Sequence, residues 1–81
     1  MMMEKQYIGQ CELSSMTICY YVIKQGNYYG VELLETQDEK LTCTSELISE
    51  VQETALSLAE KLLKNNVTST TLIDIIDDHI N

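Results

Sequence analysis

Apolar and polar residues alternate through the first half of the chain, which is the pattern of half-buried β-strands. Three runs show it, at residues 5–13, 17–25 and 28–36, and they are rich in Tyr, Val, Ile and Thr. Gly26-Asn27 separates the second run from the third and favours a two-residue hairpin turn with Gly at its first central position. We therefore predict an antiparallel meander of three strands.

The turns predict which strand residues face each other. A two-residue turn at Gly26-Asn27 places Val22 opposite Val31, and a similar turn at Ser14-Ser15 places Cys11 opposite Ile18. Because side chains alternate across a strand, both registers gather apolar residues on one face, which we expect to form the core. That face comprises Tyr7, Cys11, Ile18, Tyr20, Val22, Tyr29, Val31 and Leu33.

Helical spacing replaces alternation in the second half of the chain. Residues 41–44 are a candidate fourth strand at an edge of the sheet. The apolar residues that follow recur at helical intervals, which predicts a helix over residues 46–65. Ser49 and Gln52 have the spacing of a capping box near the start of this helix.

A second, shorter helix is expected over residues 69–79, with Thr68 as its N-cap. The two amphipathic helices must bury their apolar stripes, and the apolar face of the meander is the simplest place to do so. The expected fold is therefore α+β: a three- to four-stranded antiparallel meander followed by two helices packed on one face. We expect a single two-layer domain over residues 1–81.

The opposite face of the predicted sheet carries a second apolar set. The same registers place Ile8, Cys19, Tyr21, Ile23 and Leu34 on the side away from both helices. Monomeric proteins rarely expose large contiguous apolar patches. We therefore expect these five residues to form an interaction surface in a homodimer, which would associate through this face or through an edge strand. The alternative is that a loop or the N-terminal methionines fold over the five residues.

The net charge of the chain limits the kinds of molecule that it is expected to bind. Thirteen acidic residues against five lysines give a formal net charge of −8, which argues against binding to nucleic acid or to an anionic membrane but is compatible with a basic protein partner. No run approaches the ~20 apolar residues of a membrane span, and the N-terminus does not resemble a signal peptide. Three cysteines without metal-ligand spacing fit free thiols in the cytoplasm.

Candidate chemistry is sparse. Asp74, Asp77, Asp78 and His79 are the one cluster of metal-ligand types, but they lack the ligand count and loop of a calcium site and are expected to form a solvated acidic face. His79 has no nucleophile or pocket assigned to it. Cys43, just before the predicted helix, is the best placed of the three cysteines for a lowered pKa. We expect neither an enzyme nor a bound cofactor.

A meander with a Tyr-Tyr strand and a Tyr-Gly-Val strand, then an amphipathic helix, then Val67-Thr68 and residues 72–78 (LIDIIDD), resembles small uncharacterised proteins of clostridia-like Gram-positive bacteria. That family is classed as a domain of unknown function, so the resemblance implies no activity, ligand or catalytic residue. We expect a small acidic protein–protein interaction or regulatory protein that self-associates. The alternative is a small-molecule-binding module with a Tyr-lined pocket between the sheet and the helices.

Overall fold

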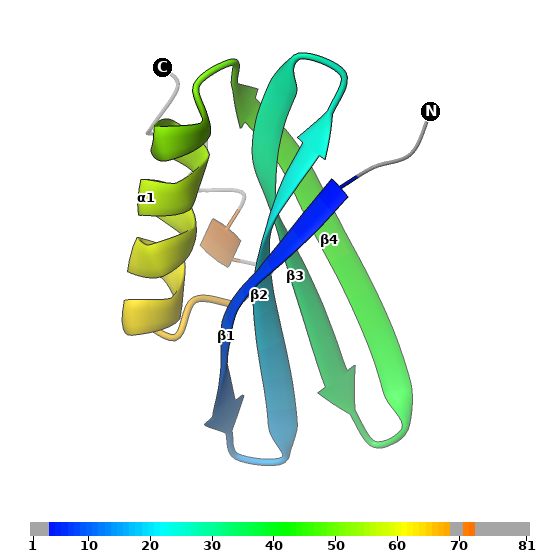
Figure 1. Ribbon diagram of the computed structural model, residues 1–81. Helices are drawn as coiled ribbons and strands as arrows, with labels where there is room; N and C mark the ends of the chain where they lie inside the picture. Colours follow the sequence, from blue (N-terminus) through cyan, green and yellow to red (C-terminus); the bar gives the residue numbers. More distant parts are fainter. Residues whose placement is uncertain (1–3, 69–70, 73–81) are drawn as a thin grey trace.

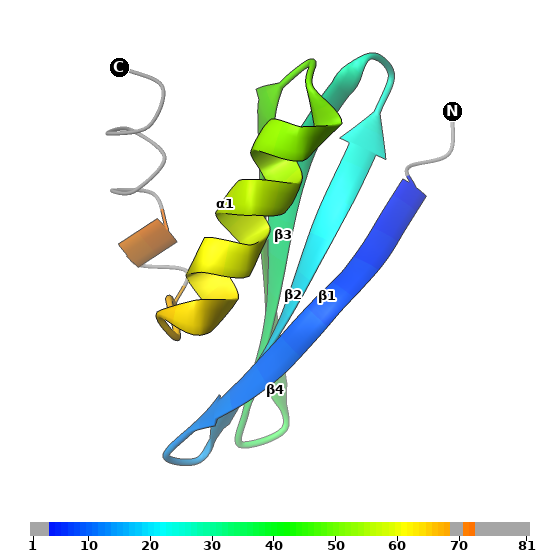
Figure 2. The ribbon, with the colours of Figure 1, turned by 60° about the vertical axis from the view of Figure 1, so that its left-hand side comes forward.

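Four strands form one antiparallel sheet in the computed structural model, which describes residues 4–68 and 71–72. They lie in the order β1-β2-β3-β4 (Figure 1). The strands are β1 (Glu4–Leu13), β2 (Met16–Gln25), β3 (Tyr28–Gln37) and β4 (Lys40–Ser49), and the helix α1 (Gln52–Lys64) follows them. The helix lies across one face of the sheet (Figures 1 and 2), so the described part of the chain has two layers.

Two-residue turns connect the strands, and each contains a residue with positive φ. Gly26 has a φ of 62°, as the first central residue of a type II′ turn requires, and the predicted register of β2 against β3 is confirmed. Asp38 and Glu39 both have positive φ, which is the conformation of a type I′ turn. Both turn types match the twist of paired strands. Each turn joins neighbouring strands, so the sheet is a meander in which every strand pairs with the next.

The fourth strand is longer than predicted, and the helix starts later. β4 pairs with β3 from Lys40 to Ser49, whereas the sequence predicted a helix from residue 46. Pairing with the long neighbouring strand outweighs the helical spacing of apolar residues in this segment. The capping box is also absent: Ser49 Oγ accepts a hydrogen bond from the amide of Val51 at 3.0 Å, and Val51 is the residue that precedes the first helical turn.

The fold prediction of two helices after the sheet is wrong for the structure as described, which has a four-stranded antiparallel sheet followed by one helix. The second predicted helix, residues 69–79, lies outside the described residues except for Thr71 and Leu72. Leu72 is fully buried, and its amide donates a hydrogen bond to the carbonyl of Thr68 at 2.9 Å. The chain beyond α1 thus contributes to the core through Leu72.

Each edge strand contains a β-bulge. In β1 the extra residue is Ile8, because Tyr7 faces Tyr21 while Gly9 faces Tyr20. In β4 the register shifts in the same way at Ile48. A bulge adds one residue to one strand and so reverses the faces of the residues beyond it.

Two side-chain predictions fail because of the bulge in β1. Tyr7, predicted in the core, lies on the opposite face and is 54% exposed. Ile8, predicted on the opposite face, packs against the core instead. The sequence-based register assumed unbroken alternation, and the bulge breaks it at this point.

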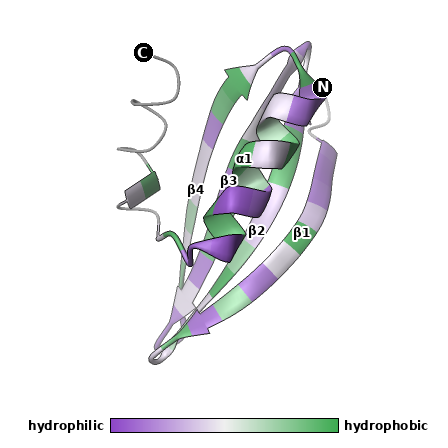
Figure 3. Cartoon of the chain, turned by 90° about the vertical axis from the view of Figure 1, so that its left-hand side faces the viewer, coloured by the Kyte–Doolittle hydropathy of each residue, from purple (hydrophilic) through white to green (hydrophobic). Residues whose placement is uncertain are grey.

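The core lies between α1 and the two central strands. In Figure 3 the helix crosses in front of the sheet, and green marks the apolar residues of both layers. The buried residues of the helix pack on those of the strands: Ala55, Leu58, Ala59 and Leu62 on Ile18, Tyr20, Val22, Val31 and Leu33. Gly9 lets β1 approach the helix closely, since a Cβ at this position would lie 2.6 Å from Cδ2 of Leu63.

Candidate interaction surface

The face of the sheet opposite α1 carries no other element of the described chain, and we call it the open face (Figure 2). The strand registers and the alternation of side chains assign its residues. They are Lys5, Tyr7, Gln10 and Glu12 of β1; Thr17, Cys19, Tyr21, Ile23 and Gln25 of β2; Tyr28, Gly30, Glu32, Leu34 and Thr36 of β3; and Leu41, Cys43, Ser45 and Leu47 of β4.

Exposed apolar side chains gather on the open face. Large hydrophobic residues that are well exposed in the described chain are Tyr7, Tyr28, Leu41, Leu47 and Val51. All except Val51 lie on the open face, and Leu41 is the most exposed of them at 65%. Scattered exposed apolar residues are normal on protein surfaces, whereas four of these five lie together on one uncovered face.

The structure places four of the five predicted surface residues on the open face. Cys19, Tyr21 and Leu34 are half-buried there, and Ile23 lies there but is only 2% exposed. The fifth, Ile8, lies on the core side because of the bulge.

Sequence reasoning missed four exposed apolar residues on this face. The bulge hid Tyr7, and Tyr28 lies immediately after the Gly26-Asn27 turn. Leu41 and Leu47 belong to β4, where apolar or small residues at every second position, Leu41, Cys43, Ser45 and Leu47, were a usable strand signal.

A glycine explains the shape of one end of the open face. Gly30 lies between Ile23 on β2 and Leu47 on β4. A Cβ at Gly30 would collide with the carbonyl oxygen of Glu46, so this position admits no side chain. Ile23 and Leu47 line a shallow depression beside it.

An ion pair lies within this apolar surface. Nζ of Lys5 is 2.5 Å from Oε1 of Glu32, whose side chain is buried although it points to the open face. The same ammonium lies 5.0 Å from the ring centroid of Tyr21, and the Tyr7 ring packs edge-on against Tyr21 at 5.6 Å. Lys5 therefore makes an ion pair and a cation–π contact at once.

The ion pair affects two titrating groups. The hydrogen bond to Glu32 raises the pKa of Lys5 above its usual value, and the negative charge of Glu32 acts in the same direction, against burial. Burial raises the pKa of the Cys43 thiol, and the neighbouring charge and hydrogen bond of Glu32 raise it further. Cys43 therefore remains a neutral thiol at pH 7, which makes it a poor nucleophile.

The other two cysteines are also engaged. The thiol of Cys19 donates to Oε1 of Gln10 at 3.7 Å on the open face, and Sγ of Cys11 lies 3.4 Å from the hydroxyl of Tyr20 on the core side. All three cysteines are free thiols.

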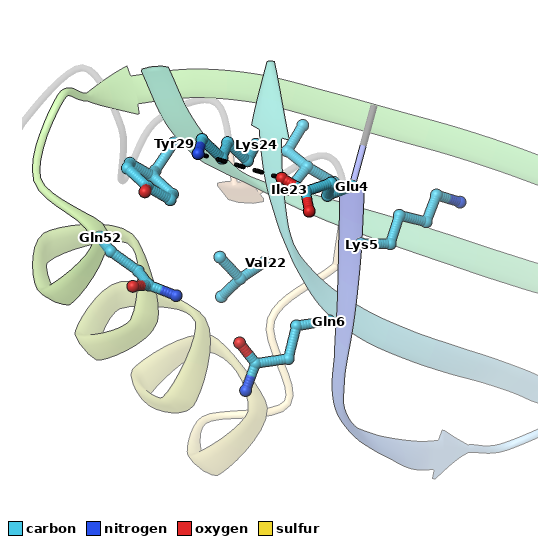
Figure 4. A pocket seen from close by; sticks show the side chains of 8 residues that line it. All are labelled: Glu4, Lys5, Gln6, Val22, Ile23, Lys24, Tyr29 and Gln52. Carbon is cyan, nitrogen blue, oxygen red and sulfur yellow. Dashed lines mark ion pairs between the residues drawn. The ribbon is translucent and has the colours of Figure 1, made fainter. Parts of the chain in front are cut away.

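A polar cleft lies on the other side of the sheet, between β1, β2 and the start of α1 (Figure 4). Its volume is about 280 Å³. Val22 lies among Gln6 and Gln52, with Lys24 above the Tyr29 ring at 5.6 Å. Glu4 also lines the cleft, with Oε2 4.0 Å from Nζ of Lys24, and Lys5 and Ile23 border it where β1 and β2 pair.

Tyr29 is the one tyrosine in the lining of this cleft, whereas the alternative drawn from the sequence expected a Tyr-lined pocket. Tyr20 is fully buried instead, and its hydroxyl donates a hydrogen bond to the carbonyl of Val67 at 2.7 Å. Burial and the contact with Cys11 raise the pKa of Tyr20.

Neither a metal centre nor a membrane span is found in residues 4–68 and 71–72. This part of the chain has no group of three or more His, Cys, Asp and Glu side chains that could hold a metal ion. Its helix is too short to cross a lipid bilayer. The acidic cluster of Asp74, Asp77, Asp78 and His79 lies outside the described residues.

Comparisons with known proteins identify a family and no specific function. No curated protein and no solved structure matches the chain. All of residues 1–81 match DUF6514, whose description is a family of unknown function, and the chain therefore belongs to the DUF6514 family.

Proposed function

We propose that this chain is a small protein-interaction module that self-associates through the open face, with no catalytic role and no bound cofactor. The observation that carries the proposal is the concentration of exposed large apolar side chains, Tyr7, Tyr28, Leu41 and Leu47, on the face that α1 leaves uncovered. A cytoplasmic setting and a clostridia-like origin are part of the proposal and rest on the sequence alone.

Charge favours a second copy as the occupant of this face. The chain has 13 acidic residues, yet the open face carries only Glu12 and Glu32, and Lys5 neutralises Glu32. Two copies can therefore meet face to face without bringing their acidic residues together. A basic protein, the alternative partner, would be attracted to acidic residues that lie elsewhere.

The open face spans four strands of ten residues each. At about 3.3 Å per residue and about 4.8 Å between strands, it measures roughly 33 by 20 Å. Stable interfaces bury about 800 Å² on each partner, so a dimer of this kind would use the whole face. Isologous pairing of identical faces is the commonest arrangement of homodimers.

Sedimentation velocity tests the proposal with a pair of matched variants. The wild-type chain should sediment as a dimer at micromolar concentration, and Leu41→Glu/Leu47→Glu should sediment as a monomer, because two carboxylates would be buried in an apolar interface. Val51→Glu, which changes an equally exposed apolar residue off the open face, should remain dimeric. A wild-type chain that stays monomeric at every accessible concentration would overturn the proposal.

A second candidate function is the binding of a small polar molecule in the cleft of Figure 4, where Gln6, Lys24, Tyr29 and Gln52 converge. Thermal denaturation with a panel of metabolites tests it, since a ligand present at 100 times its Kd stabilises a protein by about 2.7 kcal/mol. Stabilisation that Gln52→Ala abolishes, with the dimer unaffected, would favour this function. No shift with any member of the panel would leave self-association as the better account.

A further inference from the structure

The outer edge of β4 is long, regular and exposed. β4 is the last strand of the sheet (Figure 1), and no strand in residues 4–68 and 71–72 pairs with its outer side. Residues 40–47 are all exposed except Thr44, which is half-buried. The chain has no proline, and the bulge at Ile48 lies beyond this stretch, so two common protections against pairing at an edge are missing here.

The edge strand on the other side of the sheet is better protected. In β1 the bulge at Ile8 falls in the middle of the strand, and Glu4, Lys5 and Glu12 place charges at both of its ends. In β4 the run LTCTS, residues 41–45, carries no charge. Of the two edges, that of β4 is therefore the one suited to adding a further strand.

The turn before β4 determines which of its backbone groups point outward. Gln37 and Lys40 close a type I′ turn, and the closing residues of such a turn are hydrogen-bonded to each other. Bonded and non-bonded pairs alternate along antiparallel strands. The backbone N–H and C=O groups of Leu41, Cys43 and Ser45 therefore point away from β3.

We propose that a second copy of this chain pairs with this edge, with the two β4 strands antiparallel and a two-fold axis at Cys43. Each outward-pointing residue then meets an outward-pointing residue: Cys43 meets Cys43 of the second copy, and Leu41 meets Ser45. The contact is isologous, so it closes as a pair of chains that share one continuous sheet.

Charge supports this register over its neighbours. With the axis at Cys43, Lys40 of each copy lies opposite Glu46 of the other, and an opposite-charge pair stabilises antiparallel strands. An axis one residue earlier would place Glu46 opposite Asp38, which brings like charges together. An axis one residue later would place Lys40 opposite Ile48 and lose the charge pair.

This inference goes beyond the open-face dimer and does not rest on it, because the edge and the open face are different surfaces that can be occupied in the same assembly. One added pair of strands makes a smaller contact than a whole face of the sheet. We therefore expect edge pairing at submillimolar concentration, above the micromolar range of the open-face dimer.

Two charge reversals test the edge contact. Lys40→Glu would set two carboxylates against each other in every pair, and Glu46→Lys would set two ammonium groups against each other, so each variant alone should lose edge pairing. An equimolar mixture restores opposite charges in every mixed pair. Sedimentation velocity at submillimolar concentration should therefore show the wild type and the mixture at twice the mass of either variant alone.

Matched controls carry the same changes of charge on α1. Lys64→Glu and Glu53→Lys change exposed residues and should each double in mass as the wild type does. A wild type that shows no doubling, single variants as heavy as the wild type, or a mixture no heavier than its components would each overturn the proposal. If only the open-face dimer is wrong, the doubling starts from a monomer instead of a dimer.

Oxidation by diamide, which takes up one hydrogen from each of two thiols as their disulfide forms, tests the register. The Cα atoms of a bonded antiparallel pair lie about 5.5 Å apart, within the range of a disulfide, whereas sheets stacked face to face lie about 10 Å apart. Cys43 should therefore cross-link two wild-type chains, and Lys40→Glu should abolish the cross-link. A cross-link that peptide mass spectrometry assigns to Cys19, or one that Lys40→Glu leaves unchanged, would overturn the register.

Discussion

The hydroxyl of Tyr20 donates a hydrogen bond to the carbonyl of Val67 at 2.7 Å, which joins the middle of β2 to the chain that follows α1. Both residues are buried, and 47 positions separate them in the sequence. This bond holds the segment after α1 against the sheet. It also gives Tyr20, the largest side chain of the core, a structural role.

Removing this hydroxyl should destabilise the fold. Tyr20→Phe leaves the carbonyl of Val67 buried without its partner, so the free energy of unfolding should fall by about 1–3 kcal/mol. Urea denaturation followed by circular dichroism measures the change. Tyr21→Phe, on the half-exposed open face, is the control and should change stability by much less; equal losses in both variants would contradict the role assigned to Tyr20.

The same residue predicts a loss of stability in alkaline solution. Its pKa is raised in the fold, first by burial and then by the contact with Cys11, from an ordinary value of 10.0. The folded state therefore keeps a proton that the unfolded state loses, and stability should decrease as the pH rises above about 10. Urea midpoints at pH 8 to 11 should fall more steeply for the wild type than for Tyr20→Phe, and parallel curves would contradict this origin.

Gly30 should be the least replaceable glycine of the sheet. An alanine Cβ there would collide with the backbone carbonyl of Glu46, so β3 and β4 would have to separate. We expect Gly30→Ala to cost roughly 3 kcal/mol or more. Gly9→Ala is the matched control, because its Cβ would meet only the flexible end of Leu63, and its cost in chemical denaturation should be clearly smaller.

Removing only one partner of the Lys5-Glu32 ion pair should cost more stability than replacing both, because Glu32 is buried whereas Lys5 is partly exposed. Lys5→Met leaves the Glu32 carboxylate buried without a counter-charge, and we expect a loss of about 1–2 kcal/mol, reduced because Lys5 is partly exposed. Lys5→Met/Glu32→Leu should recover most of this loss. A double variant less stable than Lys5→Met would contradict this account, because it would show that Glu32 stabilises the chain even without Lys5. Denaturation at concentrations below dimer formation is the appropriate measurement.

Turn chemistry made most of the sheet predictable. Gly26-Asn27 correctly gave the facing residues along β2 and β3, and Ser14-Ser15 gave Cys11 opposite Ile18. The bulge at Ile8 could not be seen, because an extra apolar residue in an alternating strand has no distinctive composition. Its consequence is confined to the start of β1: the residues before Ile8, Tyr7 among them, lie on the face opposite to the one that unbroken alternation predicts, and Ile8 packs against the core.

The secondary structure of the segment around Leu47 and Ile48 was harder to predict, because the same apolar residues fit a helix or a strand. Alternation from Leu41 to Leu47 favours the strand, whereas the spacing of Ile48 with later apolar residues favours the helix. Pairing with the full length of β3 decides between them, and that is a tertiary effect. For the same reason the sequence located the centre of the open face, at Cys19, Tyr21 and Leu34, but not its β4 border.

Alkylation of the Cys43 thiol tests association through the open face most directly. Cys43 is exposed and lies on that face in β4, so a second copy that covers the face would protect it from the reagent. Its rate of alkylation, followed by peptide mass spectrometry, should fall as protein concentration rises through the dimer range. A cysteine introduced by Ser57→Cys, at an exposed position of α1, should react at a constant rate. Equal rates at Cys43 in a dilute monomer and in a concentrated dimer would contradict association through the open face.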